Sequence, residues 1–326
     1  MLGGEHMSPS NTQPALDLRA VLCQVLRSGE AIPAELPDYC LWQGDVEAFL
    51  DGLAERPLFD LIVTSPPYNL GKPYETRQEF RDYLEWQARV IDKCVRRLCD
   101  TGSICWQVGN YVEGTGRRAS VLPLDIVFHD VFRRFDLTLR NRIVWQYGHG
   151  LHCKHRFSGR HEVVLWYTKT DDYTFNLDAV RVPPKYPGKK HYKGPRAGQY
   201  SCNPRGKNPE DVWEIPNVKS NHLEKTIHPC QFPVALIERL ILALTREGEL
   251  VFDPFAGVAS AGVAAALTGR RFCGCEVDRD YVDIGKRRID GTADGSTRIR
   301  PLDRPIYDPA NSGKLARDPF RGGGKA

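Results

Sequence analysis

No stretch of this 326-residue chain approaches the roughly 18 uninterrupted apolar residues of a membrane-spanning helix. The N-terminus from Met1 to Pro14 is polar and rich in small residues, without the basic and then apolar pattern of a signal peptide. The ten cysteines are scattered, and the close pair Cys273 and Cys275 has no second pair or histidine at zinc-finger spacing. We therefore expect no membrane span, no structural metal and a reducing cytoplasm, where cysteines stay as free thiols.

Net charge is also small, and a value of +4 does not by itself indicate nucleic-acid binding. With 41% hydrophobic and 26% charged residues, the composition is that of an ordinary globular protein. The length allows one large domain with an insertion, or two domains. Functional information must therefore come from local motifs.

The first such motif is Ser65-Pro66-Pro67-Tyr68, which follows an apolar run over 60–64 that predicts a short buried strand. Two prolines cannot continue a central strand, so the chain must leave the sheet there, at the carboxyl edge where open α/β sheets bind ligands. A hydroxyl, a rigid carbonyl and an aromatic ring at that edge suit a flat heterocycle with an exocyclic amino group. The alternative is a proline-rich turn without a function.

The second motif lies nearly 200 residues later, where an apolar run over 249–252 leads into Asp253-Pro254-Phe255-Ala256-Gly257. A small-residue helix over 259–267 and a further strand over 271–278 complete a predicted β-α-β unit. Glu276 stands 19 residues after Gly257, the spacing at which a carboxylate grips ribose hydroxyls. The chain lacks G-x-G-x-x-G, so a binding site for a pyrophosphate is not indicated. The predicted unit instead suits a nucleoside with a compact, positively charged tail, and Asp253 is expected to face that charge. The alternative is an ordinary β-α-β crossover.

Together the two motifs resemble those of the DNA amino-methyltransferases, which use S-adenosylmethionine and carry (D/N/S)-P-P-(Y/F) and F-x-G-x-G elements. The catalytic element precedes the cofactor element here, which is the permuted order of that family's beta group. The resemblance covers roughly residues 40–290. It implies a Rossmann-like α/β methyltransferase fold, with a mostly parallel central sheet and helices on both faces.

The resemblance also implies roles for individual residues. The catalytic residues are expected to be Ser65, Pro66, Pro67 and Tyr68. The cofactor-binding residues are expected to be Asp45, Asp253, Pro254, Phe255, Gly257, Ser260 and Glu276, with His228-Pro229 and a helix over 233–241 opening this half. Ala259 replaces the second glycine of the cofactor element, and its methyl group is expected to narrow the space near the methionine part of the cofactor.

A basic, irregular segment separates the two halves. Residues 181–225 hold ten Lys or Arg against four acids, an excess of six positive charges that leaves the rest of the chain at about −2. Long irregular insertions are usually functional or disordered, and basic residues interleaved with Tyr suit phosphate contacts and stacking. The resemblance implies a target-recognition region that binds double-stranded DNA through Lys185, Lys189, Lys190, Lys193, Arg196, Arg205 and Lys207. The alternative is a solvated loop.

These assignments divide the chain into five parts: an N-terminal extension (1–39), a catalytic half (40–180), the target-recognition insertion (181–225), a cofactor-binding half (226–290) and a tail (291–326) that ends in Gly322 to Gly324. Periodicity further predicts helices over 77–98 and 122–135, and strands over 102–108, 137–146 and 161–168. The loop over 148–157 contains His and Cys residues. We expect it to be a mobile loop that touches DNA or closes over the site, in preference to a zinc site.

The expected chemistry follows from the weak nucleophilicity of an exocyclic amine, whose lone pair is delocalised into the ring. The base must leave the stack, and its nitrogen must be held in line with the methyl–sulfonium bond. Hydrogen bonds from the amino group to Ser65 and to the Pro66 carbonyl would localise the lone pair, while Tyr68 stacks on the base. This chemistry requires no metal and no covalent enzyme intermediate.

Several alternatives remain at this point. Ser at the first catalytic position is usual for N4-cytosine enzymes of the resembling family, and Asp or Asn for N6-adenine enzymes, so N4-cytosine is favoured over N6-adenine. Pro229-Cys230-Gln231 matches the nucleophile motif of C5-methyltransferases but stands in the wrong order, so Cys230 is expected to be a packing residue. Glutamine methyltransferases differ in the first motif residue and in motif order. A DNA-binding module without catalysis is the remaining class, with Ala259 as its local support.

The resemblance finally implies a bacterial, cytoplasmic enzyme associated with DNA. Its partners would be double-stranded DNA and, in a restriction-modification system, a cognate restriction endonuclease. A homodimer is also expected from the resemblance.

Overall fold

The computed structural model describes residues 21–69, 78–148, 150 and 152–304. The strands are β1 (Gln24–Arg27), β2 (Tyr39–Gln43), β3 (Phe59–Thr64), β4 (Leu98–Val108), β5 (Asn110–Glu113), β6 (Ser120–Pro123), β7 (Thr138–Gln146), β8 (His161–Thr168), β9 (Val212–Glu214), β10 (Leu250–Asp253) and β11 (Arg271–Glu276). The helices are α1 (Val46–Gly52), α2 (Phe80–Arg97), α3 (Leu124–Phe132), α4 (Val234–Leu244), α5 (Ser260–Leu267) and α6 (Arg279–Asp290), with single turns at Gly116–Arg118 and Leu177–Val180.

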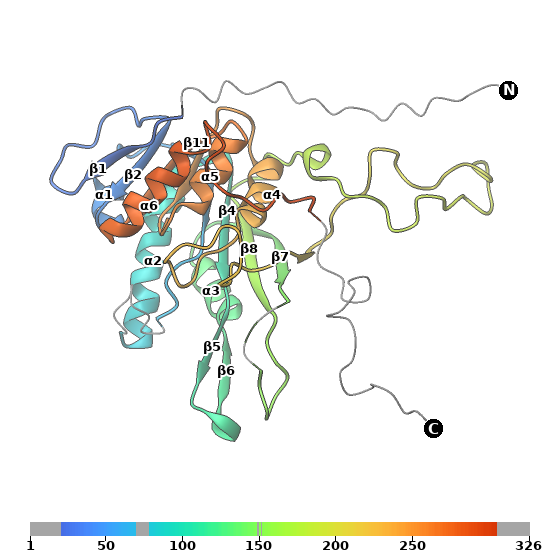
Figure 1. Cartoon of the computed structure of the whole chain (residues 1–326), viewed down its shortest axis with the longest axis horizontal. Helices are drawn as coiled ribbons and strands as arrows, with labels where there is room; N and C mark the ends of the chain where they lie inside the picture. Colours follow the sequence, from blue (N-terminus) through green and yellow to red (C-terminus); the bar gives the residue numbers. More distant parts are fainter. Residues whose placement is uncertain (1–20, 70–77, 149, 151, 305–326) are drawn as a thin grey trace, which may run out of the picture.

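One large sheet organises the molecule, with strand order β1-β2-β11-β10-β3-β4-β8-β7-β9 (Figure 1). The first six strands in this order are parallel. β8 is antiparallel to β4 and to β7, and β9 is parallel to β7. The predicted α/β fold with a mostly parallel central sheet is therefore confirmed.

The order of the strands explains how two motifs far apart in sequence meet. β10 pairs directly with β3, with Val251 opposite Leu61 and Phe252 opposite Ile62. Both strands are buried on both faces, as the continuous apolar runs predict. Ser65 and Pro254 begin the segments that leave these two strands at the same edge.

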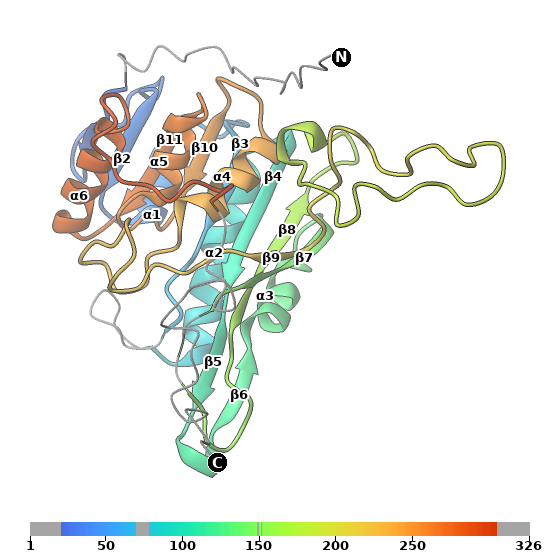
Figure 2. The same ribbon diagram turned by 45° about the vertical axis from the view of Figure 1, so that its right-hand side comes forward.

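Helices cover both faces of the sheet (Figures 1 and 2). On one face α4, α5 and α6 bury Leu236, Ile241 and Val263, among other residues. On the other face α1, α2 and α3 bury Phe49, Ile91 and Phe128. In that second layer the rings of Phe59 and Phe252 stack at 4.3 Å between centroids, which packs β3 and β10 together.

The predicted helices and strands all occur, with shifted ends. The helix expected over 77–98 begins at Phe80, and position 77 lies outside the described residues. β4 begins at Leu98, directly where α2 ends, because its register with β3 extends back to Leu98 opposite Phe59. Sequence reasoning did not predict β1, β2, α1, the β5–β6 hairpin, β9 or α6. All except α6 are short elements whose stability depends on their neighbours, and α6 follows directly on the predicted motif.

The structure also bears on the boundaries of the five parts. β1 pairs with β2, so residues 24–27 of the expected N-terminal extension belong to the sheet. Residues 181–211 leave the body as a long excursion (Figures 1 and 2), held by the isolated bridges Val182–Lys207 and Lys190–Tyr200. Residues 212–218 return to the body, where Trp213 and Ile215 are buried. The described tail contacts the body through Arg300, whose N–H donates to Glu224 at 2.9 Å, while Met1 to Pro14 and Gly322 to Gly324 lie outside the described residues.

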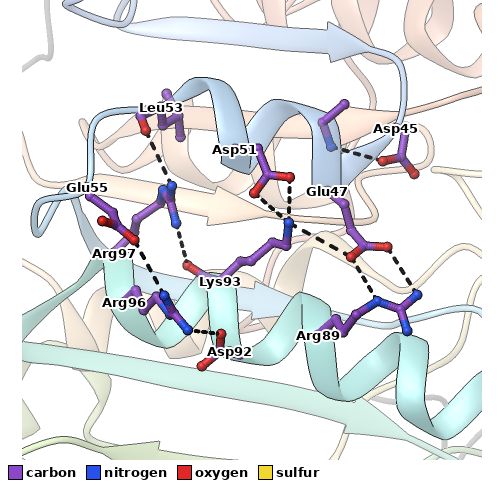
Figure 3. A network of polar contacts seen from close by, with 11 residues as sticks. Asp45, Glu47, Asp51, Leu53, Glu55, Arg89, Asp92, Lys93, Arg96 and Arg97 are labelled. Atoms are coloured by element: carbon purple, nitrogen blue, oxygen red, sulfur yellow. Dashed lines mark hydrogen bonds and ion pairs between the residues drawn. The ribbon is translucent and has the colours of Figure 1, made fainter.

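A network of charged side chains ties α1 to α2 (Figure 3). Arg89 and Lys93 of α2 pair with Glu47 and Asp51 of α1, and Arg96 pairs with Glu55 beyond it. Such exposed pairs contribute only about 0.2–1 kcal/mol each. Their effect is local: they hold the helix whose N-cap is Asp45, which accepts the Ala48 N–H at 3.0 Å.

Within the part of the chain that the structure describes, no helix combines the length and the apolar character needed to cross a membrane.

Candidate active site

The carboxyl ends of β2, β11, β10, β3 and β4 open onto a cavity of about 580 Å³. This volume lies within the range of about 300–1,000 Å³ that ligand sites usually occupy. The cavity brings together ten of the eleven residues predicted for catalysis and cofactor binding: Ser65, Pro66, Pro67, Tyr68, Asp45, Pro254, Phe255, Gly257, Ser260 and Glu276.

The predicted catalytic motif forms a tightly held loop at the end of β3. The hydroxyls of Ser65 and Tyr68 lie 3.2 Å apart. Tyr83 of α2 donates its hydroxyl to the Pro67 carbonyl at 2.7 Å. Asn69 adopts the left-handed φ of 58° and holds the backbone of Gln78 by two hydrogen bonds, of 2.8 and 2.7 Å. The loop is therefore fixed in place by groups on both sides of the segment over 70–77.

The cofactor end of the cavity contains two carboxylates at the tips of neighbouring strands. Glu276 ends β11 and accepts the Asp278 N–H at 2.8 Å, and the Gly257 N–H also donates to it. Burial raises the pKa of Glu276 above its ordinary value, and these backbone donors oppose the rise. Asp45 follows β2, whose Gln43 pairs with Glu276. Two acids near a glycine turn suit the hydroxyls and the cationic tail of a nucleoside.

Gly257 itself needs to be glycine. It adopts a φ of +51°, and a Cβ atom there would lie 3.1 Å from Nε2 of His228. Burial lowers the pKa of His228 to about 4, so its ring is neutral at neutral pH. The neutral imidazole therefore packs against this turn without adding a positive charge.

Asp253 does not line the cavity, so the expectation that it faces a positively charged tail is wrong. Its carboxyl is fully buried and accepts the Thr64 hydroxyl at 2.6 Å and the Phe255 N–H at 3.1 Å. Burial raises its pKa to about 7 despite these two donors. Thr64 directly precedes Ser65, so its hydrogen bond to Asp253 joins the ends of β3 and β10, from which the two predicted loops start.

Ala259 also differs from expectation, because it does not line the cavity and its methyl group does not narrow it. A Cβ atom on Gly285 of α6 would lie 3.0 Å from the Ala259 Cβ, so the methyl group points toward that helix. Ala259 adopts the left-handed conformation, with φ 56° and ψ 45°, which explains why glycine is expected at this position.

Ala259→Gly should change the free energy of unfolding by less than about 1 kcal/mol. Relief of the left-handed strain, worth about 1–2 kcal/mol, offsets the lost buried methyl group at about 0.8 kcal/mol and the extra chain entropy of glycine at about 0.5–1 kcal/mol. The affinity for S-adenosylmethionine should stay unchanged. Urea unfolding and calorimetric titration check the two values, and a tenfold gain in affinity would show that the methyl group does obstruct the cavity.

The seven predicted DNA-binding residues lie on the excursion and not at the cavity. Lys190 lies over the ring of Tyr200 at 5.1 Å, and Lys185 over Tyr186 at 5.6 Å. Arg205 and Lys207 form ion pairs with Asp178 and Glu210. Lys189, Lys193 and Arg196 complete the set, and all three side chains are exposed. The structure thus separates residues 181–211 from the cavity, while Lys219 of the basic segment lines it.

The cavity also contains residues that the motifs did not indicate, notably Gln107, Tyr147, Glu162 and Lys219. The sequence signal for Glu162 is that it is the one acid in a strongly apolar strand, but its place at the carboxyl edge of β4 follows only from the antiparallel pairing. From the loop over 148–157, Cys153 and Arg156 line the cavity, while 149 and 151 lie outside the described residues. In the described ranges no three His, Cys, Asp or Glu residues form a group that could hold a metal ion.

Cys230, expected to pack in the interior, is exposed at the rim of the cavity. Its N–H donates to Nδ1 of His228 at 3.3 Å. Pro229 and Cys230 lie in a turn ahead of α4, whose first helical residue is Val234, so Cys230 does not reach the buried face of that helix. All ten cysteines are free thiols.

Comparison with known proteins gives concordant results. A family model for N6/N4 methyltransferases, described as DNA methylase, matches residues 59–287. The chain is 45% identical over 274 residues to Type II methyltransferase M.BglII of Bacillus subtilis, covering 83% of this chain and 75% of that protein. It is 34% identical over 236 residues to DNA adenine methyltransferase YhdJ of Escherichia coli K12, covering 71% and 76%.

Solved structures share the fold. PvuII DNA methyltransferase, described as cytosine-N4-specific, has a TM-score of 0.59 at 19% identity, covering 78% of this chain and 90% of that one. The putative DNA modification methylase TTHA0409 of Thermus thermophilus, solved with S-adenosyl-L-methionine, has a TM-score of 0.56 at 24% identity, covering 82% and 99%.

Proposed function

Because the chain belongs to the N6/N4 DNA methyltransferase family, and is thus a DNA methyltransferase that uses S-adenosylmethionine, we propose that it methylates the exocyclic N4 amino group of a flipped-out cytosine. The observation that carries the proposal is the arrangement of Ser65 and Tyr68 in one cavity with Gly257 and Glu276. A target base held by Ser65 and Tyr68 and a cofactor held by Gly257 and Glu276 would meet within that cavity.

The residues present fit the cofactor. Glu276 would accept hydrogen bonds from the ribose hydroxyls, and Pro254 and Phe255 would contact the adenine. Because Gly257 has no side chain, the backbone of its turn could approach the cofactor closely. Asp45, at the N-cap of α1, would face the cationic end. When bound, S-adenosylmethionine supplies an electrophilic methyl group on a sulfonium.

The chain's own residues would position the acceptor. Ser65 Oγ would accept a hydrogen bond from the amino group, which localises the nitrogen lone pair as the transition state forms. Tyr68 would stack on the base, and the Pro66 carbonyl would accept the second amino hydrogen. Tyr83 and Asn69 hold this loop before any ligand binds, so the geometry is pre-organised.

The neutral Ser65 supports cytosine, as does the fold shared with a cytosine-N4-specific enzyme. A second candidate, the N6 amino group of adenine, is supported by the 34% identity to a protein named as a DNA adenine methyltransferase. Expression in a bacterial host that lacks its own DNA methyltransferases separates the two, because the nucleosides of the host genome record the product. Accumulation of N4-methylcytosine is expected, and N6-methyladenine in its place would overturn the choice of base.

We further propose that the excursion over 181–211 contacts the phosphates of double-stranded DNA and serves target recognition. Its exposed Lys residues lie beside Tyr rings, a combination that suits backbone contacts with stacking. The likeness to type II methyltransferases supports a role in restriction-modification beside a cognate endonuclease. A homodimer remains part of the proposal.

Replacing Lys185, Lys189, Lys190 and Lys193 by Ala should weaken DNA binding and lower the slope of log K against log salt by about 0.9 for each phosphate that the variant no longer neutralises. Cofactor affinity should not change, because none of the four residues lines the cavity. A control of equal charge replaces Arg27, Arg56, Arg133 and Arg246, which are exposed elsewhere, outside the α1–α2 network and the cavity. Fluorescence anisotropy at several salt concentrations measures both variants, and equal losses of affinity in the two would refute a specific role for the excursion.

A further inference from the structure

The carboxyl group of Glu162 lies against the catalytic loop. β8 runs antiparallel to β4, with Val163 opposite Val108, so the first residues of β8 stand at the carboxyl edge where the parallel strands end. A Cβ atom on Gly109 would lie 3.3 Å from Oε1 of Glu162 and also 3.3 Å from Cε2 of Tyr68. The glycine thus leaves the space in which the carboxyl group and the tyrosine ring meet.

A chain of hydrogen-bonding groups connects this carboxyl to the catalytic serine. The Ser65 and Tyr68 hydroxyls are 3.2 Å apart. The Tyr68 hydroxyl also donates to the Gln107 carbonyl at 3.5 Å, and it is near enough to Glu162 to lower the pKa of that carboxyl. On its other side, Glu162 accepts hydrogen bonds from the Gln107 amide and from the Tyr147 hydroxyl, the latter at 3.4 Å. Two donors thus hold the carboxyl toward Tyr68.

Methylation of an amino group creates a need that Ser65 cannot meet. The nitrogen gains a methyl carbon while it still carries two hydrogens, so one proton must leave. A serine hydroxyl can pass a proton on but cannot keep it, since it is neutral and weakly basic. Of the carboxylates that line the cavity, Asp45 follows β2 and Glu276 ends β11, at the end proposed for the cofactor, whereas Glu162 lies beside the Tyr68 ring.

We propose that Glu162 is the terminal proton acceptor of the transfer, reached through the hydroxyls of Tyr68 and Ser65. This inference rests on the function proposed above. The nitrogen–carbon bond forms as the carbon–sulfur bond breaks, with its electron pair left on sulfur. The amino proton passes to Ser65 Oγ, the serine proton to Tyr68 Oη, and the tyrosine proton to the Glu162 carboxylate. One proton is thus lost by the nitrogen and gained by Glu162, and no other reactant is required.

The surroundings of Glu162 make its carboxylate a stronger proton acceptor than an exposed glutamate. Burial raises its pKa above the ordinary value of 4.5, while Gln107, Tyr147 and Tyr68 oppose the rise by hydrogen bonding and Lys219 by its charge. The positive charge of Arg160 opposes the rise in the pKa of Tyr147 that burial and Glu162 cause. Burial and the nearby Glu162 raise the pKa of Tyr68, so its hydroxyl stays protonated and relays the proton without holding a charge. Acceptors are most effective when their pKa lies near the working pH.

The experiment is single-turnover methyl transfer by the full chain as a function of pH, with genomic DNA and saturating S-adenosylmethionine. The wild-type rate should fall as the pH drops through the raised pKa of Glu162, because the protonated form cannot accept. Glu162→Gln should slow transfer about 100-fold and remove this acidic limb, within the usual range for a general base. Its affinities for the cofactor and DNA should stay within about threefold. Glu214→Gln, a change of the same kind at an exposed site on β9, should behave as wild type.

Tyr147→Phe provides a second variant that keeps the carboxyl. Removing this donor should move the acidic limb to higher pH while the rate at the plateau stays near wild type, since the hydrogen bond lowers the pKa of Glu162. If the wild type is active and Glu162→Gln keeps the same rate and the same acidic limb of the pH profile, the relay is overturned while the proposed function stands. Equal losses of cofactor affinity and rate in that variant would also overturn it, in favour of a structural role. An inactive wild type would instead overturn the proposed function, and the relay with it.

Discussion

Ser65→Ala should lower the rate constant of methyl transfer by about 100- to 1,000-fold, the effect of removing one transition-state hydrogen-bond partner. Ser65 lines the cavity, and its hydroxyl lies 3.2 Å from the hydroxyl of Tyr68. The substitution removes this hydroxyl and leaves intact the hydrogen bonds of Tyr83 and Asn69 that hold the loop. The affinity for S-adenosylmethionine should change less than threefold. Quenched-flow transfer of labelled methyl groups and calorimetric titration give the two values.

Tyr68→Ala should be at least as damaging, because it removes both the stacking ring and the hydroxyl. Stacking of a base on an aromatic side chain is worth about 1–3 kcal/mol. Tyr68→Phe is the matched control: it keeps the ring, so base binding should persist while the slower transfer reports the hydroxyl. Full activity in Ser65→Ala would contradict the catalytic assignment, and full activity in Tyr68→Phe would contradict the proposed proton path.

The second large effect is expected at the cofactor end, where Glu276→Ala should weaken S-adenosylmethionine binding by about 100-fold or more. Two charge-assisted hydrogen bonds to ribose hydroxyls, at about 1.5–3 kcal/mol each, would be lost. Saturating cofactor should restore most of the transfer rate, because Glu276 does not touch the acceptor base in the proposed arrangement. Isothermal titration and rates at several cofactor concentrations measure this separation.

Glu276→Gln serves as the control for that experiment. The amide keeps the size of the side chain and one acceptor oxygen, so the loss of affinity should be intermediate. Because Glu276 also accepts the Asp278 and Gly257 N–H groups, thermal unfolding must accompany each titration. If the folded Glu276→Ala variant binds S-adenosylmethionine as tightly as the wild type, the proposal that this end of the cavity binds the cofactor is contradicted.

The parts of the site that sequence predicted are those fixed by local covalent constraints. Pro66 and Pro67 force the chain out of the sheet, and the apolar runs before Ser65 and Asp253 can only be buried strands. The parallel order then places both loops at one edge, as observed. The identity of the motifs and the spacing to Glu276 therefore carried most of the prediction.

The parts that sequence missed depend on contacts between distant segments. Glu162 reaches the site only because β8 runs antiparallel to β4, a pairing that no local pattern encodes. Asp253 has the expected place in the motif, yet the Thr64 hydroxyl draws its carboxyl beneath the cavity. Ala259 adopts the left-handed conformation that glycine favours, and the direction of its methyl group follows from the approach of Gly285. In each case tertiary packing decided where the side chain points.

The central claim is that the Ser65 site transfers a methyl group from S-adenosylmethionine to cytosine N4 in DNA. The most direct measurement incubates the purified chain with unmethylated genomic DNA and isotopically labelled S-adenosylmethionine, digests the DNA to nucleosides and identifies the labelled product by mass spectrometry. Labelled N4-methylcytosine is the predicted result. Labelled N6-methyladenine would contradict the choice of base, and the absence of any labelled nucleoside would contradict the catalytic site itself.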